Sequence, residues 1–224
     1  MWTAVVEARE GTSKRAAEAL EQLACAYWRP LYVFQRQRGR DHDAAAEDVQ
    51  GFFAHLLGRD FLRFVHPREG RFRTFLLTAF TRWLDDERDR AQAAKRGGGA
   101  TPISLDEFDS LSDFVASSEE PPETTFDRHW AREVFEAALV RLRESWAERM
   151  ELFHALRSSL TGGQEDYATI GARLGLSEGA VKKAAFDLRG KFARIIREEV
   201  RRTVRDNDAV DEELRYLINL LRSE

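Results

Sequence analysis

The chain reads Asp166-Tyr-Ala-Thr-Ile-Gly-Ala-Arg-Leu-Gly-Leu-Ser-Glu-Gly-Ala-Val-Lys-Lys-Ala-Ala-Phe-Asp-Leu-Arg189 in its most informative stretch. Within it, Gly175 suits the left-handed conformation that often ends a helix, because glycine has no Cβ to strain there. Ser177, two residues later, is a good N-cap for a following helix. The stretch therefore predicts two short helices joined by a tight turn.

Each of these two helices has one apolar face. Ile170 and Leu174 provide it in the first helix, and Gly171 beside them is small enough to let the second helix pack closely. The apolar stripe of the second helix consists of Val181, Ala185, Leu188 and Phe192. This layout is that of a helix-turn-helix, whose second helix enters the DNA major groove in the versions that read DNA.

The opposite face of the second helix is predicted to be exposed. Its two lysines have no acid nearby on that face and suit contact with phosphate, and the phenylalanine ring suits a thymine methyl group. A plain helical hairpin with a solvated basic face is the alternative interpretation. The candidate DNA-binding residues of this motif are Ser177, Gly179, Lys182, Lys183, Phe186 and Arg189.

The rest of the chain also has helical periodicity. Apolar residues recur with helical spacing in residues 49–57, 72–84 and 130–142, and alternating β patterns are absent. Phe72, Phe75, Phe80 and Trp83 share one helical face, which favours core packing over base stacking. We expect an all-α chain of two small helical domains joined by an acidic linker. The predicted divisions are an N-terminal extension and first domain (1–96), the linker (97–125), the helix-turn-helix domain (126–203) and a tail (204–224).

Charge is distributed unevenly over the 224 residues, whose net charge is −4. Residues 97–127 carry eight acidic and no basic side chains, whereas residues 26–96 carry 14 basic and 10 acidic ones and residues 128–205 carry 16 and 11. The local electrostatic field, rather than the net charge of the chain, decides what a surface attracts. A polyanion partner is therefore compatible with residues 26–96 and with residues 128–205, which both carry an excess of basic side chains.

Several features of the sequence indicate in which cellular compartment the protein acts. The lone Cys25 excludes a disulfide framework and is expected to be buried in the core. The N-terminal residues carry charges where a signal peptide needs an apolar stretch, and no apolar run approaches the roughly 20 residues of a membrane span. We therefore expect a cytoplasmic protein with no membrane insertion.

The tail has an apolar stripe of its own. It is formed by Val210, Leu214, Leu217, Ile218 and Leu221, on a helix too short to be stable alone. We expect this amphipathic helix to dock on the basic second domain. Whether it acts there as a structural brace or as a gate that competes with DNA is left open.

Three stretches of the chain resemble the extracytoplasmic-function group of sigma-70-type bacterial transcription initiation factors. Residues 26–34 with 46–57 are similar to regions 2.1 and 2.2, which bind the β′ clamp of RNA polymerase. Residues 71–86 are similar to regions 2.3 and 2.4, which melt and read the minus-ten promoter element. The helix-turn-helix resembles region 4.2, which reads the minus-thirty-five element. The resemblance covers most of residues 26–200.

The resemblance implies a promoter-specificity subunit whose partners are core RNA polymerase (the β′ clamp and the β flap), promoter DNA and an anti-sigma or other regulatory protein. It implies polymerase contacts by Glu47, Asp48 and Gln50. The basic, non-core face of residues 71–82, together with the preceding loop in which the family places a pocket for a flipped base, supplies the minus-ten candidates. They are Arg63, His66, Arg68, Arg71, Arg73, Thr78 and Arg82.

Catalysis is not expected. The five histidines lack metal-ligand spacing, and no paired-carboxylate, Ser-His or glycine-rich phosphate signature is present, so no catalytic residue, metal or cofactor is predicted. Two other functions remain as alternatives. One is a stand-alone helix-turn-helix regulator that never binds polymerase, and the other is a protein-interaction adaptor on a sigma-like fold.

Overall fold

The computed structural model describes residues 13–57, 71–94, 120–163, 166–204 and 209–222. Every regular element in these residues is helical, apart from one isolated antiparallel bridge between Arg71 and Val204, which confirms the all-α prediction. The helices are α2 (Ser13–Gln37), α3 (His42–Leu57), α5 (Phe72–Ala94), α6 (Pro122–Glu144), α7 (Met150–Leu156), α8 (Tyr167–Leu174), α9 (Glu178–Thr203) and α10 (Ala209–Arg222), with 3₁₀ turns at Ala147–Arg149 and Arg157–Leu160.

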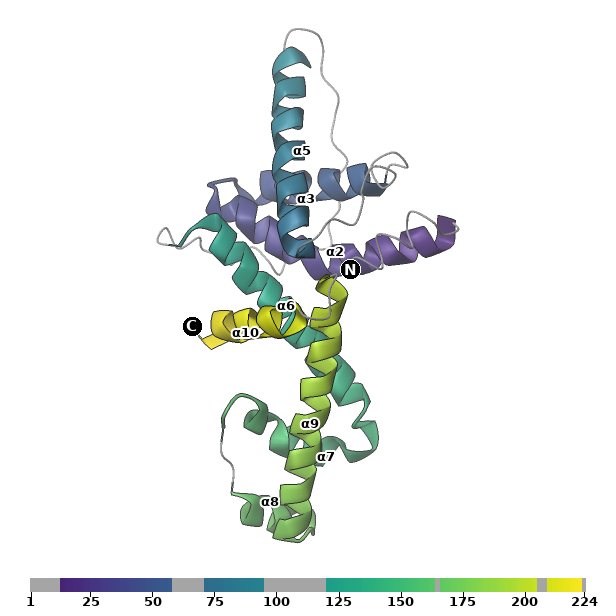
Figure 1. The fold of residues 1–224 in the computed structure, drawn as a ribbon, viewed down its shortest axis with the longest axis vertical. Coiled ribbons are helices and arrows are strands. Elements are labelled where there is room, and N and C mark those ends of the chain that lie inside the picture. The colour runs from purple at the N-terminus through teal and green to yellow at the C-terminus, as the bar shows by residue number, and fades with distance from the viewer. Residues whose placement is uncertain (1–12, 58–70, 95–119, 164–165, 205–208, 223–224) are drawn as a thin grey trace.

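The molecule is elongated, with α3 and α5 at one end and α8 with the start of α9 at the other (Figure 1). Two long helices, α6 and α9, run between these ends. Helix α6 packs against both α2 and α9, and α10 packs against α6 and α9 at the middle of the molecule. The first helical group (α2, α3 and α5) is therefore joined to the helix-turn-helix end through α6. Within the described residues, no helix is long and apolar enough to cross a membrane.

Aromatic side chains hold the first helical group together. The rings of Phe52 on α3 and Phe80 on α5 are 5.0 Å apart, and both side chains are fully buried. A Cβ atom at Gly51 would lie 2.9 Å from the ring of Trp83, so a larger residue in this close crossing of α3 and α5 would have to displace that ring. Phe72 is also buried, against the ring of Tyr27 on α2. These aromatics are core residues, as their shared helical face predicts.

Helix α6 begins earlier than the sequence predicts. Pro121 is its N-cap and Pro122 its first residue, so residues 122–125 are helical rather than linker. Phe126 and Trp130 in its first half are buried, and Phe126 packs edge-on against Phe34 of α2 with ring centroids 6.5 Å apart. Of the remaining predicted linker residues, Glu120 and Pro121 are described, and residues 97–119 lie outside the described residues.

The tail forms the predicted amphipathic helix, α10, and most of the predicted stripe packs against the core: Val210 and Leu217 are buried, and Leu214 and Leu221 are partly buried. The buried residues are Val210, Glu213, Leu217 and Leu220, whereas Ile218 of the predicted stripe is 38% exposed. Glu213 is buried beside this stripe because it faces two arginines of the first helical group. The expectation that Cys25 is a core residue is wrong: its place on α2 is exposed.

Candidate nucleic-acid interface

The helix-turn-helix has the predicted caps at Gly175 and Ser177, and a further cap at Asp166 that was not predicted. Asp166 begins α8 by accepting hydrogen bonds from the backbone N–H groups of Ala168 and Thr169 at 3.3 and 3.2 Å. Gly175 ends α8 with φ of 65°, the left-handed conformation. The Ser177 hydroxyl then accepts from the backbone N–H of Ala180 at 3.2 Å and starts α9. Each cap acts on residues only a few positions away along the chain, so the spacing of residue types is enough to predict such caps.

Gly171 permits a closer approach than the sequence predicts. A Cβ atom there would lie 2.6 Å from the carbonyl oxygen of Leu176 and 3.5 Å from the backbone nitrogen of Glu178. The group that comes closest is therefore the backbone of the turn rather than the second helix itself. Ile170, Val181 and Leu188 are buried beneath it and hold α8 against α9.

A Gly171→Ala substitution should destabilise the motif by about 1–3 kcal/mol, because the Leu176 carbonyl is backbone and cannot move without opening the turn. Gly179→Ala is the matched control, since a Cβ there meets nothing within 4 Å and alanine favours a helix by about 0.5–1 kcal/mol. Urea unfolding of both variants checks this. Equal stability of the two variants would contradict the close approach.

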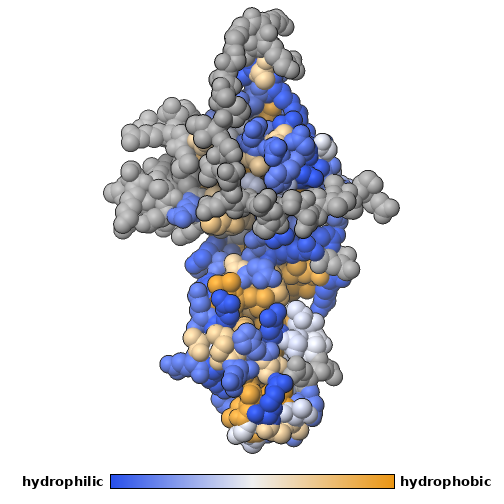
Figure 2. Space-filling view, turned by 180° about the vertical axis from the view of Figure 1, so that it is seen from behind, coloured by the Kyte–Doolittle hydropathy of each residue, from blue (hydrophilic) through white to orange (hydrophobic). Residues whose placement is uncertain are grey.

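The predicted DNA-facing side of α9 is exposed. Phe186 is 71% exposed and lies on the same face as Gly179 and Gly190, beside which the surface is open. Leu176 in the turn is 39% exposed. The helix-turn-helix end, seen from behind in Figure 2, has hydrophobic surface next to hydrophilic residues. This end of the molecule offers an apolar contact surface flanked by charge.

The two lysines of this face are not free of acids, which corrects the prediction. Lys182 lies 2.6 Å from Glu178, and Lys183 lies 3.3 Å from Asp187. Both acids are four residues away, the spacing at which helix side chains meet. The hydrogen bond with Glu178 raises the pKa of Lys182 above its usual value. A phosphate must compete with these carboxylates.

Arg189 also has a partner, since its guanidinium donates to the hydroxyl of Tyr167 on α8 at 3.2 Å. The same face of α9 continues into a cationic stretch that the sequence reading missed. Arg194, Arg197 and Arg201 line a hollow of about 210 Å³ beside Val210 of α10. Successive helix residues are about 100° apart, so this spacing continued past Gly190 predicts that these three arginines lie on the face of Phe186. Arg197 lies 2.5 Å from Asp211 of α10, so the tail already neutralises part of this stretch.

The minus-ten candidates differ in accessibility. Thr78 and Arg82 are exposed on α5, and the Thr78 hydroxyl donates to the Thr74 carbonyl one turn earlier. Arg71 is only 35% exposed and lies 2.7 Å from Glu212. Arg63, His66 and Arg68 lie outside the described residues.

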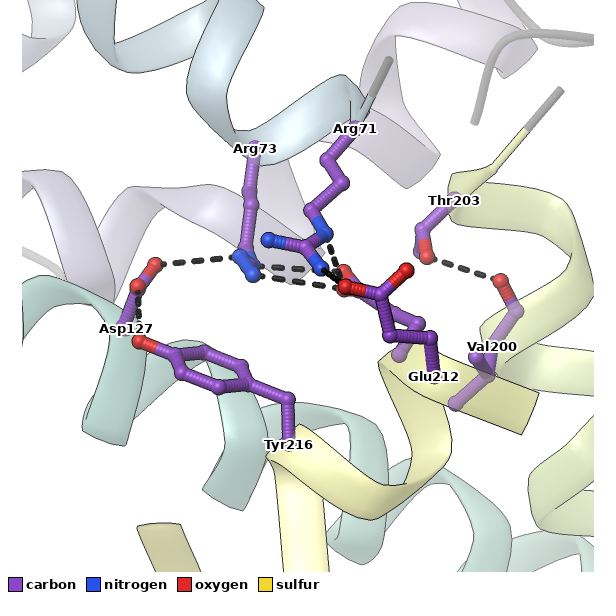
Figure 3. Close-up of polar contacts among 8 residues, drawn as sticks. Arg71, Arg73, Asp127, Val200, Thr203, Glu212 and Tyr216 are labelled. Carbon is purple, nitrogen blue, oxygen red and sulfur yellow. Dashed lines mark hydrogen bonds and ion pairs between the residues drawn. The ribbon is translucent and has the colours of Figure 1, made fainter. Parts of the chain in front are cut away.

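Arg73 is not a surface residue, which corrects its assignment as a DNA contact. It is 2% exposed, and its guanidinium lies 3.2 Å from Glu213 and 3.5 Å from Asp127 (Figure 3). The rings of Trp130 and Tyr216 face its guanidinium carbon at 4.7 and 4.5 Å. Arg73 therefore joins α5 to α6 and α10 in the interior of the molecule.

Other groups complete this cluster. Arg71 also contacts Glu213, at 2.8 Å, and the Tyr216 hydroxyl donates to Asp127 at 2.6 Å. Burial raises the pKa of Glu213, against the opposing effect of Arg73 and Arg71. Burial also raises the pKa of Tyr216, to about 12, and the hydrogen bond to Asp127 acts in the same direction. Sequence patterns carry no signal for such contacts, because the partners lie up to about 140 residues apart.

The predicted polymerase-binding residues on α3 also differ in accessibility and in their contacts. Glu47 and Gln50 are exposed. Asp48 instead accepts hydrogen bonds from Gln35 at 2.5 Å and from Arg40 at 2.9 Å, which fixes α3 against the end of α2. Asp48 therefore has an intramolecular role as well, in joining α3 to the end of α2.

Comparison of the chain with protein-family profiles, with curated proteins and with solved structures gives no match.

Proposed function

We propose that the protein is a promoter-specificity factor of the sigma type, which binds core RNA polymerase and directs transcription initiation. The observation that carries the proposal is the helix-turn-helix, with both caps in place and the exposed Phe186 on the second helix. Its geometry suits insertion of α9 into a major groove, where an apolar ring can contact a thymine methyl group. In this proposal, α8 and α9 read the minus-thirty-five element.

The first helical group supports the same proposal through its exposed polar residues. Thr78 and Arg82 lie on the surface of α5, in the stretch that resembles the minus-ten reader, and Glu47 and Gln50 lie on the surface of α3, in the stretch that resembles the clamp-binding helix. In this proposal the two ends of the molecule form two domains, and the acidic residues 97–119 form the linker between them. The site of action is the cytoplasm.

The ion-paired lysines favour a polymerase-dependent factor over a stand-alone regulator. Counterion release by free lysines and arginines supplies most of the affinity of DNA-binding proteins, and Lys182 and Lys183 each already have a carboxylate partner. The free protein should therefore bind DNA weakly, with polymerase supplying the remaining affinity.

Run-off transcription with core bacterial RNA polymerase on a library of genomic fragments tests the proposal. We expect the protein to direct initiation at a small set of fragments that core polymerase alone does not transcribe. Sequence-specific DNA binding without initiation would instead identify a stand-alone regulator. Polymerase binding with neither activity would identify an adaptor.

Two variants locate the contacts in the same assay. Phe186→Ala should reduce the transcript from the selected promoters about fivefold or more while polymerase binding stays unchanged, since one base contact contributes about 1–3 kcal/mol. Glu47→Arg with Gln50→Arg should abolish both polymerase binding and transcription. Asp48 is left intact because its contacts hold α3 to α2. Unchanged polymerase binding by the α3 variant would refute the docking surface.

A further inference from the structure

The second half of α9 carries three arginines on one face. Arg194, Arg197 and Arg201 are spaced three and four residues apart, so their side chains lie along one side of the helix. All three are exposed. Together with Glu198 and Val210 they line a hollow of about 210 Å³, which we call the arginine hollow. Val210 lies in the first turn of α10, which packs beside α9 in the middle of the molecule (Figure 1).

The positive charge of the arginine hollow is not fully neutralised by its own residues. Its lining has three arginines and one carboxylate, that of Glu198, which is already held by Arg141 of α6 at 2.9 Å. Asp211 of α10 lies 2.5 Å from Arg197. Arg194 has no ion-pair partner among the residues that the structure describes. The hollow therefore attracts a further anion.

The side chains of the hollow suit a phosphate group. A guanidinium is planar and always charged, and its N–H donors match the oxygens of a phosphate in pairs. Asp211 already places carboxylate oxygens against Arg197, so the fold accommodates an anion at this position. Both members of that pair are about half exposed, and an exposed ion pair contributes little stability. A phosphate group can therefore take the place of the carboxylate.

The lining also argues against recognition of other ligand parts. The residues that line the hollow include no aromatic ring and no amide side chain that would recognise a base or a sugar, and Val210 is their one apolar member. Charge is therefore what the hollow recognises, and the rest of a ligand would extend into solvent.

We propose that the arginine hollow is a binding site for a phosphate group, which Arg194 and Arg201 hold together with Arg197 once Asp211 is displaced. The phosphate belongs either to a DNA backbone or to a free phosphorylated small molecule. The DNA source rests on the proposed function, whereas the phosphate site itself does not.

The position of the hollow along α9 favours the DNA backbone as the source. Arg194 follows Phe186 by eight residues, which is about 12 Å at 1.5 Å per residue. A major groove is only about 8.5 Å deep. When α9 enters end-on with Phe186 at the floor of the groove, Arg194 lies beyond the groove edge, where phosphates rather than bases are the nearest groups. These contacts would add affinity without sequence preference.

The first arm of the test measures binding of a random-sequence DNA duplex by fluorescence anisotropy, without polymerase, from about 50 to about 200 mM salt. Arg194→Gln with Arg201→Gln should weaken binding about tenfold or more at the lowest salt. The slope of log K against log salt should fall by about 2, since each phosphate contact contributes about 0.9. This double variant retains Arg197 and Asp211, so α10 keeps its ion pair with α9.

Two further variants control for net charge and for folding. Arg88→Gln with Arg90→Gln removes the same charge from α5, where each arginine is exposed and contacts an acid three residues earlier, and should leave the salt slope unchanged. Asp211→Asn removes the competing carboxylate and should strengthen duplex binding severalfold. A misfolded variant cannot produce such a gain.

The second arm uses inorganic pyrophosphate as the probe, measured by isothermal titration calorimetry. A site for free phosphorylated small molecules should bind one pyrophosphate per chain, and Arg194→Gln with Arg201→Gln should abolish that binding. Loss confined to the duplex arm assigns the phosphate to DNA, and loss confined to the pyrophosphate arm assigns it to a small molecule. Loss in both arms supports a site that takes phosphate from either source.

The outcomes separate this inference from the proposed function. If the double variant keeps the wild-type duplex affinity and salt slope and loses no pyrophosphate binding, the phosphate site is overturned and the sigma assignment stays intact. Absence of run-off transcription by the unmodified chain would instead refute the proposed function, while a loss in either binding arm would still establish the phosphate site.

Discussion

An Arg73→Met variant should lose about 3 kcal/mol of its free energy of unfolding. The substitution leaves the fully buried carboxylate of Glu213 without its most buried cationic partner, and a broken buried ion pair costs about 3–5 kcal/mol. The lower end of this range applies because Arg71 still contacts Glu213 at 2.8 Å. Urea unfolding followed by circular dichroism measures the loss.

A double variant and a surface variant make this expectation specific. Arg73→Met combined with Glu213→Leu should recover most of the stability, since an apolar pair of similar volume replaces the ion pair. Arg88→Met removes an exposed pair with Asp85 on the same helix and should change stability by less than about 0.5 kcal/mol. If the single Arg73 variant were as stable as the Arg88 variant, the burial of this cluster would be wrong.

Acid should destabilise the protein in a pH window set by His129. This side chain is 6% exposed, and its pKa is lowered from 6.5 to about 4 by burial first and then by the nearby charges of Arg132, Arg29 and Arg128. Between pH 6.5 and pH 4 the unfolded chain therefore binds a proton that the folded chain does not. The stability from this group is complete above pH 6.5 and is lost as pH falls towards 4, by about 3 kcal/mol in total.

The pH dependence of urea unfolding between pH 4 and pH 7.5 tests this expectation. His129→Gln should flatten the curve between pH 6.5 and pH 4, whereas His154→Gln, at an exposed position, should leave its slope unchanged. The pKa of Glu120 is also lowered, mainly by its hydrogen bond with Arg128. The stability that Glu120 contributes to the folded chain is therefore lost only as pH falls below 4.5, the usual pKa of a glutamate. Parallel curves for the wild-type and His129→Gln chains would contradict the burial of His129.

The sequence alone was sufficient for the local structure. The cap at Ser177, the left-handed Gly175 and the exposed Phe186 all follow from interactions within a few residues, and the structure confirms each of them. Helical periodicity likewise identified the all-α class and the buried aromatics of α3 and α5. Such features are readable because backbone caps and helical faces depend on residue spacing alone.

Only the tertiary structure decided the partners of the charged residues. Arg73 and Asp48 have the sequence context of surface residues, yet one is buried against Glu213 and the other is held by Gln35 and Arg40. The tail shows the same limit, since its periodicity predicts most of the packed face but not the burial of Glu213 beside it. A charge becomes internal when a partner from a distant segment compensates its desolvation, and no spacing rule within one helix encodes which segment that is.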